Sequence, residues 1–337
     1  MAIIAGIDEA GFGPVLGPLV VSGVAFRVPD ARAGVCLWEL LRGGVCRKVA
    51  KSERRLPVLD SKKLYRSGEG FTALERTALV MLAAGGWRPT TFRSLLQQAS
   101  PRTVADAEHY PWYAGRDFAL PAANGESAAG SRTSPGAPNA NDETAIALRA
   151  NSVRRELESN GAAFLGVFSE VLLEGHYNRL ARTTRNKAIV LLGLVMSIVD
   201  RIMKASPNES VCVYVDRLGG RTRYREPLCT SLPGYELEIL EESSERSAYR
   251  LTRAARSCSI SFTTEGEDHH FPVALASIYS KYLRELSMMS FNRYWCDQQP
   301  GLQPTAGYYA DAQRWLADAD ATVRRLGIRK DQLVRER

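Results

Sequence analysis

The amino-acid sequence predicts an α/β fold in which a mixed sheet is flanked by helices and followed by a helical C-terminal portion. Two apolar, β-branched runs open the chain, with only a glycine-rich turn between them. Through the middle of the chain, short apolar runs alternate with segments of helical periodicity. From about residue 272 onward the pattern is helical. Strands first, then alternation, then helices is the order typical of this fold class.

Strands are expected where apolar runs are short and bounded by turn residues. These runs cover 2–8, 19–28 (LVVSGVAFRV), 163–172, 211–216 (VCVYVD), 235–241 and 257–264. Helical periodicity covers 31–44, 70–84, 185–205, 272–291, 309–319 and 320–334.

Composition places the chain among ordinary globular proteins. Of its 337 residues, 45% are hydrophobic and 24% are charged. The best candidate for a membrane span, AIVLLGLVMSIVD, is too short, and the N-terminus lacks the pattern of a secretion signal. The six cysteines form no CxxC pair, which favours buried, reduced thiols. We therefore expect a cytoplasmic protein that is monomeric and has no membrane partner.

The charge distribution favours a polyanionic partner. The formal net charge is +7, from 44 Lys and Arg against 37 Asp and Glu. Six basic side chains crowd between Arg42 and Arg55, and the last stretch, RRLGIRKDQLVRER, is similarly basic. Such runs are often only solvated surface. Because these two flank a candidate acidic site, they favour a nucleic-acid track.

Residues 121–143 interrupt the pattern. The segment PAANGESAAGSRTSPGAPNANDE has almost no bulky apolar side chain and is rich in Ala, Gly, Ser, Pro and Asn. Such a stretch cannot bury enough surface to offset its ordering entropy. It is interpreted as a disordered insertion within one domain, because the strands on both sides need each other for a sheet. A linker between two domains is the alternative.

Carboxylates stand at the ends of two predicted strands. Asp8 ends the first strand, Glu9 follows it, and Asp216 ends a later strand. An acidic patch at 265–268 (EGED) precedes the helix expected at 272–291. The carboxyl ends of strands are where ligands and catalytic groups collect in open α/β sheets. Carboxylates brought together usually persist only around cations, and hard oxygen ligands favour Mg²⁺ or Mn²⁺ over zinc. Two such ions can promote phosphodiester hydrolysis.

Five blocks of sequence resemble a known family. The string GIDEAGFGPVLGPLVV resembles the signature of the type 2 ribonucleases H, GIDEAGRGPLAGPVV. Four further blocks resemble later family segments in the same order. They are LDSKKL (59–64), VYVDRLGG (213–220), FPVALASIYSKYLRE (271–285) and GYYADAQRWL (307–316). The first block is highly specific, and the five together cover most of the chain outside 90–160.

The resemblance implies a ribonuclease H-like fold and a metal-dependent endoribonuclease. Such an enzyme hydrolyses RNA in RNA–DNA hybrids, or ribonucleotides embedded in duplex DNA. Its products carry 3′-hydroxyl and 5′-phosphate ends, and it uses Mg²⁺ or Mn²⁺. The implied organisation is a catalytic domain over 1–290 and a helical substrate-binding region over 291–337.

The matched carboxylates are implied to be both catalytic residues and metal ligands. Asp8, Glu9 and Asp216 match three of the four family positions. The usual family spacing points to Glu267 as the fourth, where the family usually has Asp. Asp268, one residue away, stays open as the alternative.

The remaining matched positions are implied to bind substrate. They are Gly11, Phe12, Gly13, Ser61, Lys62, Lys63, Ser277, Lys281 and Tyr308. A lysine suits substrate phosphates as a point charge, and Tyr308 is expected to stack on a sugar or base at the cut site.

Phe12 is the main departure from the family, which has Arg or Lys between the two glycines. The family loop reads the ribose 2′-hydroxyl largely through backbone groups, so Phe12 need not abolish recognition. Losing a cation there should weaken binding. Phe12 could instead stack on a base or simply pack.

Two other functions stay open. A nucleic-acid-binding relative with weakened catalysis is suggested by Phe12 and by the unsettled fourth acid. A phosphate-loop nucleotide hydrolase is suggested by the glycine-rich turn after the first strand, although the chain lacks the GK[ST] that would hold nucleotide phosphates.

Overall fold

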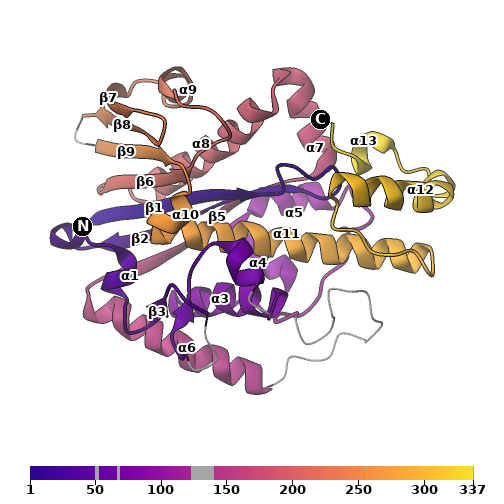
Figure 1. Ribbon diagram of the computed structural model, residues 1–337, viewed down its shortest axis with the longest axis horizontal. Coiled ribbons are helices and arrows are strands. Elements are labelled where there is room, and N and C mark those ends of the chain that lie inside the picture. The colour runs from indigo at the N-terminus through magenta and orange to yellow at the C-terminus, as the bar shows by residue number, and fades with distance from the viewer. Residues whose placement is uncertain (50–52, 67–68, 123–139, 255, 337) are drawn as a thin grey trace.

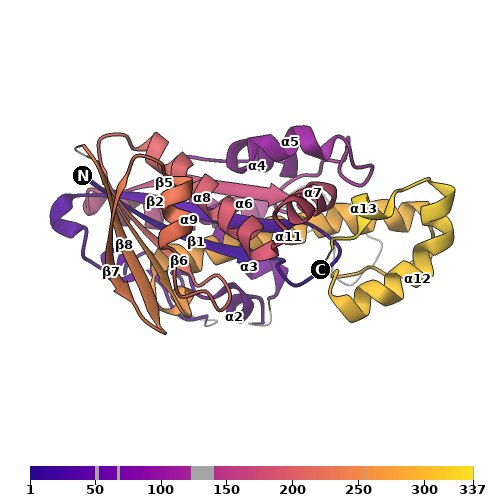
Figure 2. The same ribbon diagram turned by 90° about the horizontal axis from the view of Figure 1, so that it is seen from above.

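A computed structural model describes residues 1–49, 53–66, 69–122, 140–254 and 256–336. Its centre is a seven-stranded mixed sheet of order β5-β2-β1-β6-β9-β8-β7 (Figures 1 and 2). The strands are β1 Ala2–Ala10, β2 Leu19–Val28, β5 Ala163–Leu172, β6 Ser210–Asp216, β7 Glu236–Glu242, β8 Arg246–Arg253 and β9 Arg256–Thr263. A separate two-stranded ladder joins β3 Val45–Cys46 to β4 Leu56–Pro57.

The three central strands, β1, β6 and β9, run parallel to one another. The outer strands β2, β5, β8 and β7 pair antiparallel with their neighbours. The carboxyl ends of the central strands therefore meet at one edge of the sheet, which is where a site is expected in such a fold.

Helices cover both faces of the sheet (Figure 1). The face that packs against α11 Phe271–Gln298 also carries α1 Leu37–Leu40, α2 Ser61–Tyr65, α3 Phe71–Ala84, α4 Phe92–Ala99, α5 Pro101–Ala107 and α6 Ala140–Ser159. The other face packs against α8 Lys187–Ala205 and α9 Arg225–Ser231. Further elements are η1 Asp30–Arg32, α7 Glu174–Thr184 and α10 Gly266–His269.

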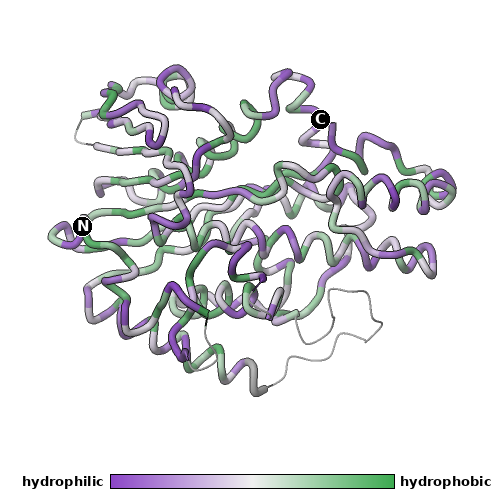
Figure 3. The backbone as a smooth tube through the Cα atoms, viewed as in Figure 1, coloured by the Kyte–Doolittle hydropathy of each residue, from purple (hydrophilic) through white to green (hydrophobic). Residues whose placement is uncertain are grey.

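Strand β1 shows how the sequence divides these two cores. Ile3, Ala5 and Ile7 belong to the core under α8, while Ala2 and Ile4 belong to the core under α11. This period of two is that of a strand buried on both faces. Figure 3 shows hydrophobic residues along the central strands of the sheet.

Gly6 lets α11 lie directly on β1. A Cβ atom at Gly6 would stand 2.2 Å from the carbonyl carbon of Pro272, which is backbone and cannot turn aside. The first turn of α11 therefore reaches the end of β1 only because residue 6 has no side chain. This contact determines how close α11 lies to the carboxylates of β1.

The C-terminal helices α12 Tyr309–Arg325 and α13 Lys330–Leu333 lie at one end of the molecule in both views (Figures 1 and 2). An aromatic cluster attaches α12 to the last turns of α11. The ring centroids of Trp295 and Trp315 are 5.1 Å apart, and those of Phe291 and Trp315 are 5.2 Å apart. The region boundary expected at residue 290 therefore falls inside α11, which continues to Gln298.

The predicted fold class is confirmed, and all six predicted strands are found. The strands at 19–28 and 163–172 have the predicted bounds, and β1, β6, β7 and β9 differ by one or two residues. Strand β8 was not predicted, because its sequence RSAYRLTR mixes charged and apolar residues like a loop. The two-residue strands β3 and β4 and the helices α2, α4, α5, α6, α7, α9 and α10 were not predicted either.

Several predicted helices have different bounds. Within 31–44 only Leu37–Leu40 is α-helical, since this stretch has two glycines near its end. The two helices predicted at 309–319 and 320–334 are mainly one, α12, because no Gly or Pro interrupts it before Gly327. In the proposed insertion at 121–143, residues 123–139 lie outside the described residues, and the rest from Ala140 onward begins α6.

The structure bears on two expectations from composition, one about a membrane span and one about the cysteines. Among the helices described, none combines the length and apolarity that a membrane span requires. All six cysteines lie in the described ranges and none is in a disulfide. Cys46 and Cys258 are buried but Cys229 is exposed, so the expectation that all the thiols are buried is wrong. Cys229 is on the short helix α9, whose residues REPLCTS have no apolar periodicity.

Candidate active site

Asp8 and Asp216 lie side by side at the carboxyl edge of the central strands. Ile7 of β1 is in register with Val215 of β6, so the next residue of each strand is one of the two aspartates. Asp8 is only 8% exposed, whereas Asp216 is half-buried. The parallel pairing of β1 and β6 thus brings together acids that are more than two hundred residues apart in sequence.

Two glutamates join this pair from adjoining segments. Glu9 follows Asp8, and its backbone N–H donates a hydrogen bond of 2.7 Å to Asp8 Oδ1. Glu267 is in the short helix α10, which is tied to β6 because the N–H of Gly266 donates to Asp216 Oδ1 at 2.9 Å. The Oε2 atoms of Glu9 and Glu267 are buried without a hydrogen-bond partner.

Burial and mutual repulsion disfavour ionisation of these carboxyl groups. Burial raises the pKa of Asp8 well above its usual range, and the charges of Glu9 and Asp216 raise it further. Burial raises the pKa of both Glu9 and Glu267 to about 7, and the neighbouring charge of Asp216 adds to each. The pKa of Asp216 is also raised, mainly by burial. A cation among these groups would reverse the repulsion.

The donor set fits a hard divalent cation. Four carboxylates supply oxygen ligands of the kind that Mg²⁺ and Mn²⁺ prefer, and two of their oxygens are otherwise unpartnered. The side chains are not gathered into a coordination shell, since no group of three or more His, Cys, Asp or Glu in the described ranges is arranged to hold a metal ion.

Serines and a lysine form the wall of the site beneath α11. The Ser277 hydroxyl lies 2.9 Å from that of Ser61 and also hydrogen-bonds with Asp8, which lowers the pKa of that carboxyl. Ser280, one turn further along α11, donates to the Asp8 carbonyl at 2.8 Å. The charge of Lys62 lowers the pKa of Glu9. This wall fixes Asp8 and places one cation near the acids.

Asp268 and Lys63 lie outside the pocket. The Lys63 ammonium donates to both carboxylate oxygens of Asp268 at 2.7 Å, and both side chains are substantially exposed. Glu267 instead faces the acids and hydrogen-bonds with Asp60, the N-cap of α2. Of the two candidates for the fourth acid, Glu267 is therefore the one that shares a pocket with Asp8.

Residues 11–18, here called the glycine loop, connect β1 to β2 and form the opposite wall. Gly11 has a φ of +84°, and a Cβ atom there would stand 2.6 Å from Arg284 Nε. The guanidinium of Arg335 donates hydrogen bonds to the carbonyl oxygens of Gly11 and Pro14. Its backbone N–H donates to the Val15 carbonyl at 2.8 Å. Both arginines are almost fully buried and hold the loop from behind.

Hydrogen bonds between Gly307 and the glycine loop place Tyr308 at the rim of the pocket. The Gly307 carbonyl accepts hydrogen bonds from the N–H groups of Val15 and Leu16, at 2.9 Å and 3.2 Å. Tyr308, the next residue, is 57% exposed, and the Arg284 guanidinium carbon is 5.8 Å from its ring centroid. An exposed ring in this position is free to stack on a ligand.

These groups line one pocket of about 260 Å³. Its lining includes twelve of the fourteen residues singled out from the sequence: Asp8, Glu9, Gly11, Phe12, Gly13, Ser61, Lys62, Asp216, Glu267, Ser277, Lys281 and Tyr308. Lys63 and Asp268 are the two that it does not include.

Sequence reasoning missed four residues of this region. Arg284 and Glu285 line the pocket, Asp60 contacts Glu267, and Arg335 holds the glycine loop. Arg284 and Glu285 are within the fourth matched block, so their spacing from Lys281 on one helix face was a usable signal. The sequence around Arg335 contains no such signal, because nothing near this residue indicates what it binds.

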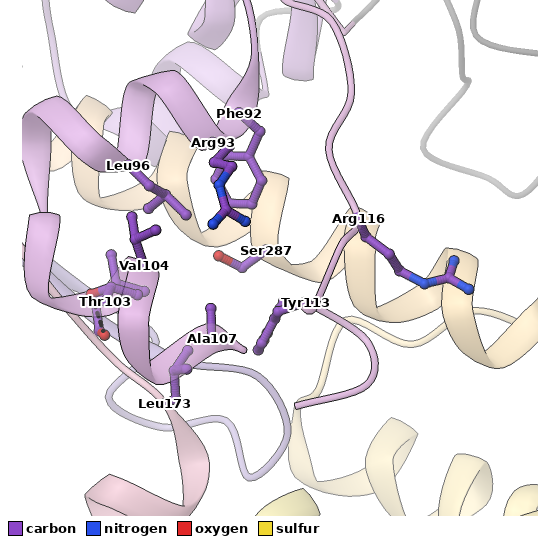
Figure 4. A pocket seen from close by; sticks show the side chains of 11 residues that line it. Phe92, Arg93, Leu96, Thr103, Val104, Ala107, Tyr113, Arg116, Leu173 and Ser287 are labelled. Atoms are coloured by element: carbon purple, nitrogen blue, oxygen red, sulfur yellow. Dashed lines mark hydrogen bonds between the residues drawn. The ribbon is translucent and has the colours of Figure 1, made fainter. Parts of the chain in front are cut away.

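A second cavity, between α4, α5 and α11, is not a comparable site (Figure 4). Its volume is about 30 Å³, room for little more than one water molecule. Side chains such as Phe92, Leu96 and Val104 surround it, and the Thr103 hydroxyl already donates to the Val171 carbonyl at 3.0 Å.

Comparisons with known proteins give structural neighbours only. The sequence matches no protein-family model and no curated protein. A variant of Bst-RNase HIII is 15% identical with a TM-score of 0.46, and the match covers 99% of this chain but 66% of that chain. RNase HII from Archaeoglobus fulgidus, solved with PCNA, is also 15% identical at a TM-score of 0.46, with 99% and 92% covered. Ribonuclease H2 from Pyrococcus horikoshii OT3 is 13% identical at a TM-score of 0.39, with 98% and 92% covered. The chain is thus similar in structure to ribonucleases HII and HIII.

Proposed function

We propose that this protein is a divalent-metal-dependent endoribonuclease of the ribonuclease H type. It would hydrolyse RNA within RNA–DNA hybrids, or ribonucleotides embedded in duplex DNA, leaving 3′-hydroxyl and 5′-phosphate ends. The observation that carries the proposal is the convergence of five separated sequence blocks on one pocket. The four acids, the serine–lysine wall, the glycine loop and Tyr308 all line it.

Each group in the pocket has a task in such a reaction. Asp8, Glu9, Asp216 and Glu267 would hold Mg²⁺ or Mn²⁺, which supplies an activated water and neutralises charge on the phosphate when bound. Ser277 and Ser280 keep Asp8 in place through their hydrogen bonds. Lys62 carries positive charge to the side of the pocket where a scissile phosphate would approach the acids.

The test is cleavage of two end-labelled duplexes, a long RNA–DNA hybrid and a DNA duplex with one ribonucleotide. We expect cleavage with Mg²⁺ or Mn²⁺ and none after chelation of divalent ions. Asp8→Asn and Asp216→Asn should each lower the rate at least about 100-fold, the scale on which a preorganised electrostatic contact acts.

Both variants should melt no earlier than wild type, since each replaces a buried repelling acid by a neutral group of the same shape. Normal cleavage by both variants, or no cleavage by wild type with either ion, would contradict the proposal.

A nucleic-acid-binding protein with weakened catalysis is the second candidate. It is favoured by Phe12, which stands where the resembled family has a basic side chain. Tight hybrid binding without cleavage in either ion would support it. The monomeric state and cytoplasmic location expected from the sequence stay predictions.

A further inference from the structure

Among the described residues that line the pocket, only one wall carries a basic side chain that is not already held by another group of the protein. Among the described residues that line it, the basic ones are Lys62, Lys281 and Arg284. Lys281 is paired with Glu285 at 3.2 Å. Arg284 is buried and donates to the Ala306 carbonyl at 2.9 Å. Lys62 on α2 is thus left as the available cation, on the side of the sheet covered by α11.

Lys187 supplies a second cation on the opposite side. It is the first residue of α8, directly after the N-cap Asn186, and its side chain is exposed. Its Nζ lies 5.2 Å from the centroid of the Phe12 ring, which lines the pocket. No acid in the described part of the chain forms an ion pair with Lys187. The ammonium is therefore held at the pocket rim by an aromatic face and is free to meet an anion.

Phe12 is placed to act as the support for this cation. Its ring is half-buried and packs against the hydrophobic core beneath α8. The Gly11 carbonyl before it is held by Arg335, so the loop that carries the ring is fixed. The ring is thus held by the core and by its loop while it contacts the Lys187 ammonium.

We propose that Lys187, seated on the Phe12 ring, binds a backbone phosphate of the nucleic acid in the pocket. This inference rests on the proposed function, because it names a further contact to the same substrate. A duplex with one phosphate at the acids carries further backbone phosphates on both sides of that phosphate. Lys62 and Lys187, approaching from opposite faces of the sheet, would each neutralise a phosphate on its own side.

The test measures binding of the full-length protein to a fluorescent RNA–DNA hybrid in chelator, where no cleavage occurs, across a series of salt concentrations. Lys187→Gln should weaken binding several-fold at low salt. It should also reduce the slope of log K against log salt by roughly 0.9, the value for one phosphate contact. Lys204→Gln, an exposed lysine at the other end of α8, is the matched control and should change neither quantity.

Phe12→Ala and the double variant Phe12→Ala with Lys187→Gln test the support role. If the ring positions the ammonium, Phe12→Ala reproduces most of the Lys187→Gln loss and the double variant loses little more. Fully additive losses would instead mean that Phe12 contacts a base independently and would overturn the support role. An unchanged salt slope in Lys187→Gln overturns the phosphate contact while leaving cleavage, and so the proposed function, intact. Absence of hybrid binding by wild type overturns both.

Discussion

Glu174 is a buried acid outside the pocket with an unusual environment. It is fully buried at the start of α7, and neither carboxylate oxygen has a hydrogen-bond partner of normal geometry. Burial raises its pKa from 4.5 to about 7, although the positive charges of Arg335 and Arg284 oppose the shift. The protonated form is therefore the one that the fold prefers.

The shift predicts a defined dependence of stability on pH. Because the folded protein holds this proton more tightly than the unfolded chain, stability should fall as pH rises from 4.5 to about 7. Glu174→Gln should remove the share of this dependence that Glu174 contributes and stabilise the protein at pH 8 by on the order of 3 kcal/mol, with little change at pH 4.5. Urea unfolding at the two pH values measures it. Glu158→Gln, at an exposed position, is the control, and parallel pH profiles for wild type and Glu174→Gln would rule the prediction out.

Single residues also show how far sequence reasoning reaches. Asp8 and Asp216 could be predicted as neighbours, since each ends an apolar run and parallel strands align their carboxyl ends. The choice between Glu267 and Asp268 could not, because it depends on the turn of α10, whose four residues have no periodicity. Lys187 could not either, because its partner Phe12 is far away in sequence.

At the scale of elements, the contact between β1 and α11 positions the site. Gly6→Ala would place a methyl group within 2.2 Å of Pro272 backbone. The helix would have to move away from the strand, which should lower the free energy of unfolding by about 2 kcal/mol or more and reduce cleavage. Gly193 in α8 has nothing within 4 Å of an added Cβ, so Gly193→Ala should raise stability by about 0.5–1 kcal/mol. Chemical denaturation compares the two, and equal effects would contradict the packing argument.

The segment 330–336 acts on the glycine loop through Arg335. Replacing Arg335 by Met should leave the buried Gly11 and Pro14 carbonyls unpaired, at a cost of about 1–3 kcal/mol each before relaxation. We expect a lower melting temperature and a fall in kcat larger than the rise in KM, because the loop wall is displaced relative to the acids.

The neighbouring pair of Arg182 and Glu336 offers a control for this variant. Glu336 belongs to this segment and Arg182 to α7, and both side chains are exposed, so Arg182→Gln should leave stability nearly unchanged and kcat unchanged. If Arg335→Met retains wild-type kcat, the loop does not depend on this contact.

For the whole molecule, the fold class followed from the order of strand and helix patterns, but the sheet order did not. The pairing of β1 with β6 joins residues about two hundred apart, and no local pattern specifies a neighbour at that distance. Strand β8, which joins β7 to the rest of the sheet, has no clean alternation of polar and apolar residues. The sequence predicts that distant segments are neighbours only where acids at strand ends and matched blocks indicate a common site.

The hydrogen bond from Arg335 to Gly11 spans 324 residues of sequence. A contact this distant in sequence closes a loop that contains the whole central sheet, so it depends on the earlier assembly of that sheet. Until this contact forms, the wall of the pocket opposite the acids lacks its support. A chain stopped before Arg329 should therefore be folded in its sheet, as circular dichroism would show, and deficient in cleavage. Activity would then require a contact that the folding of the catalytic strands does not itself supply.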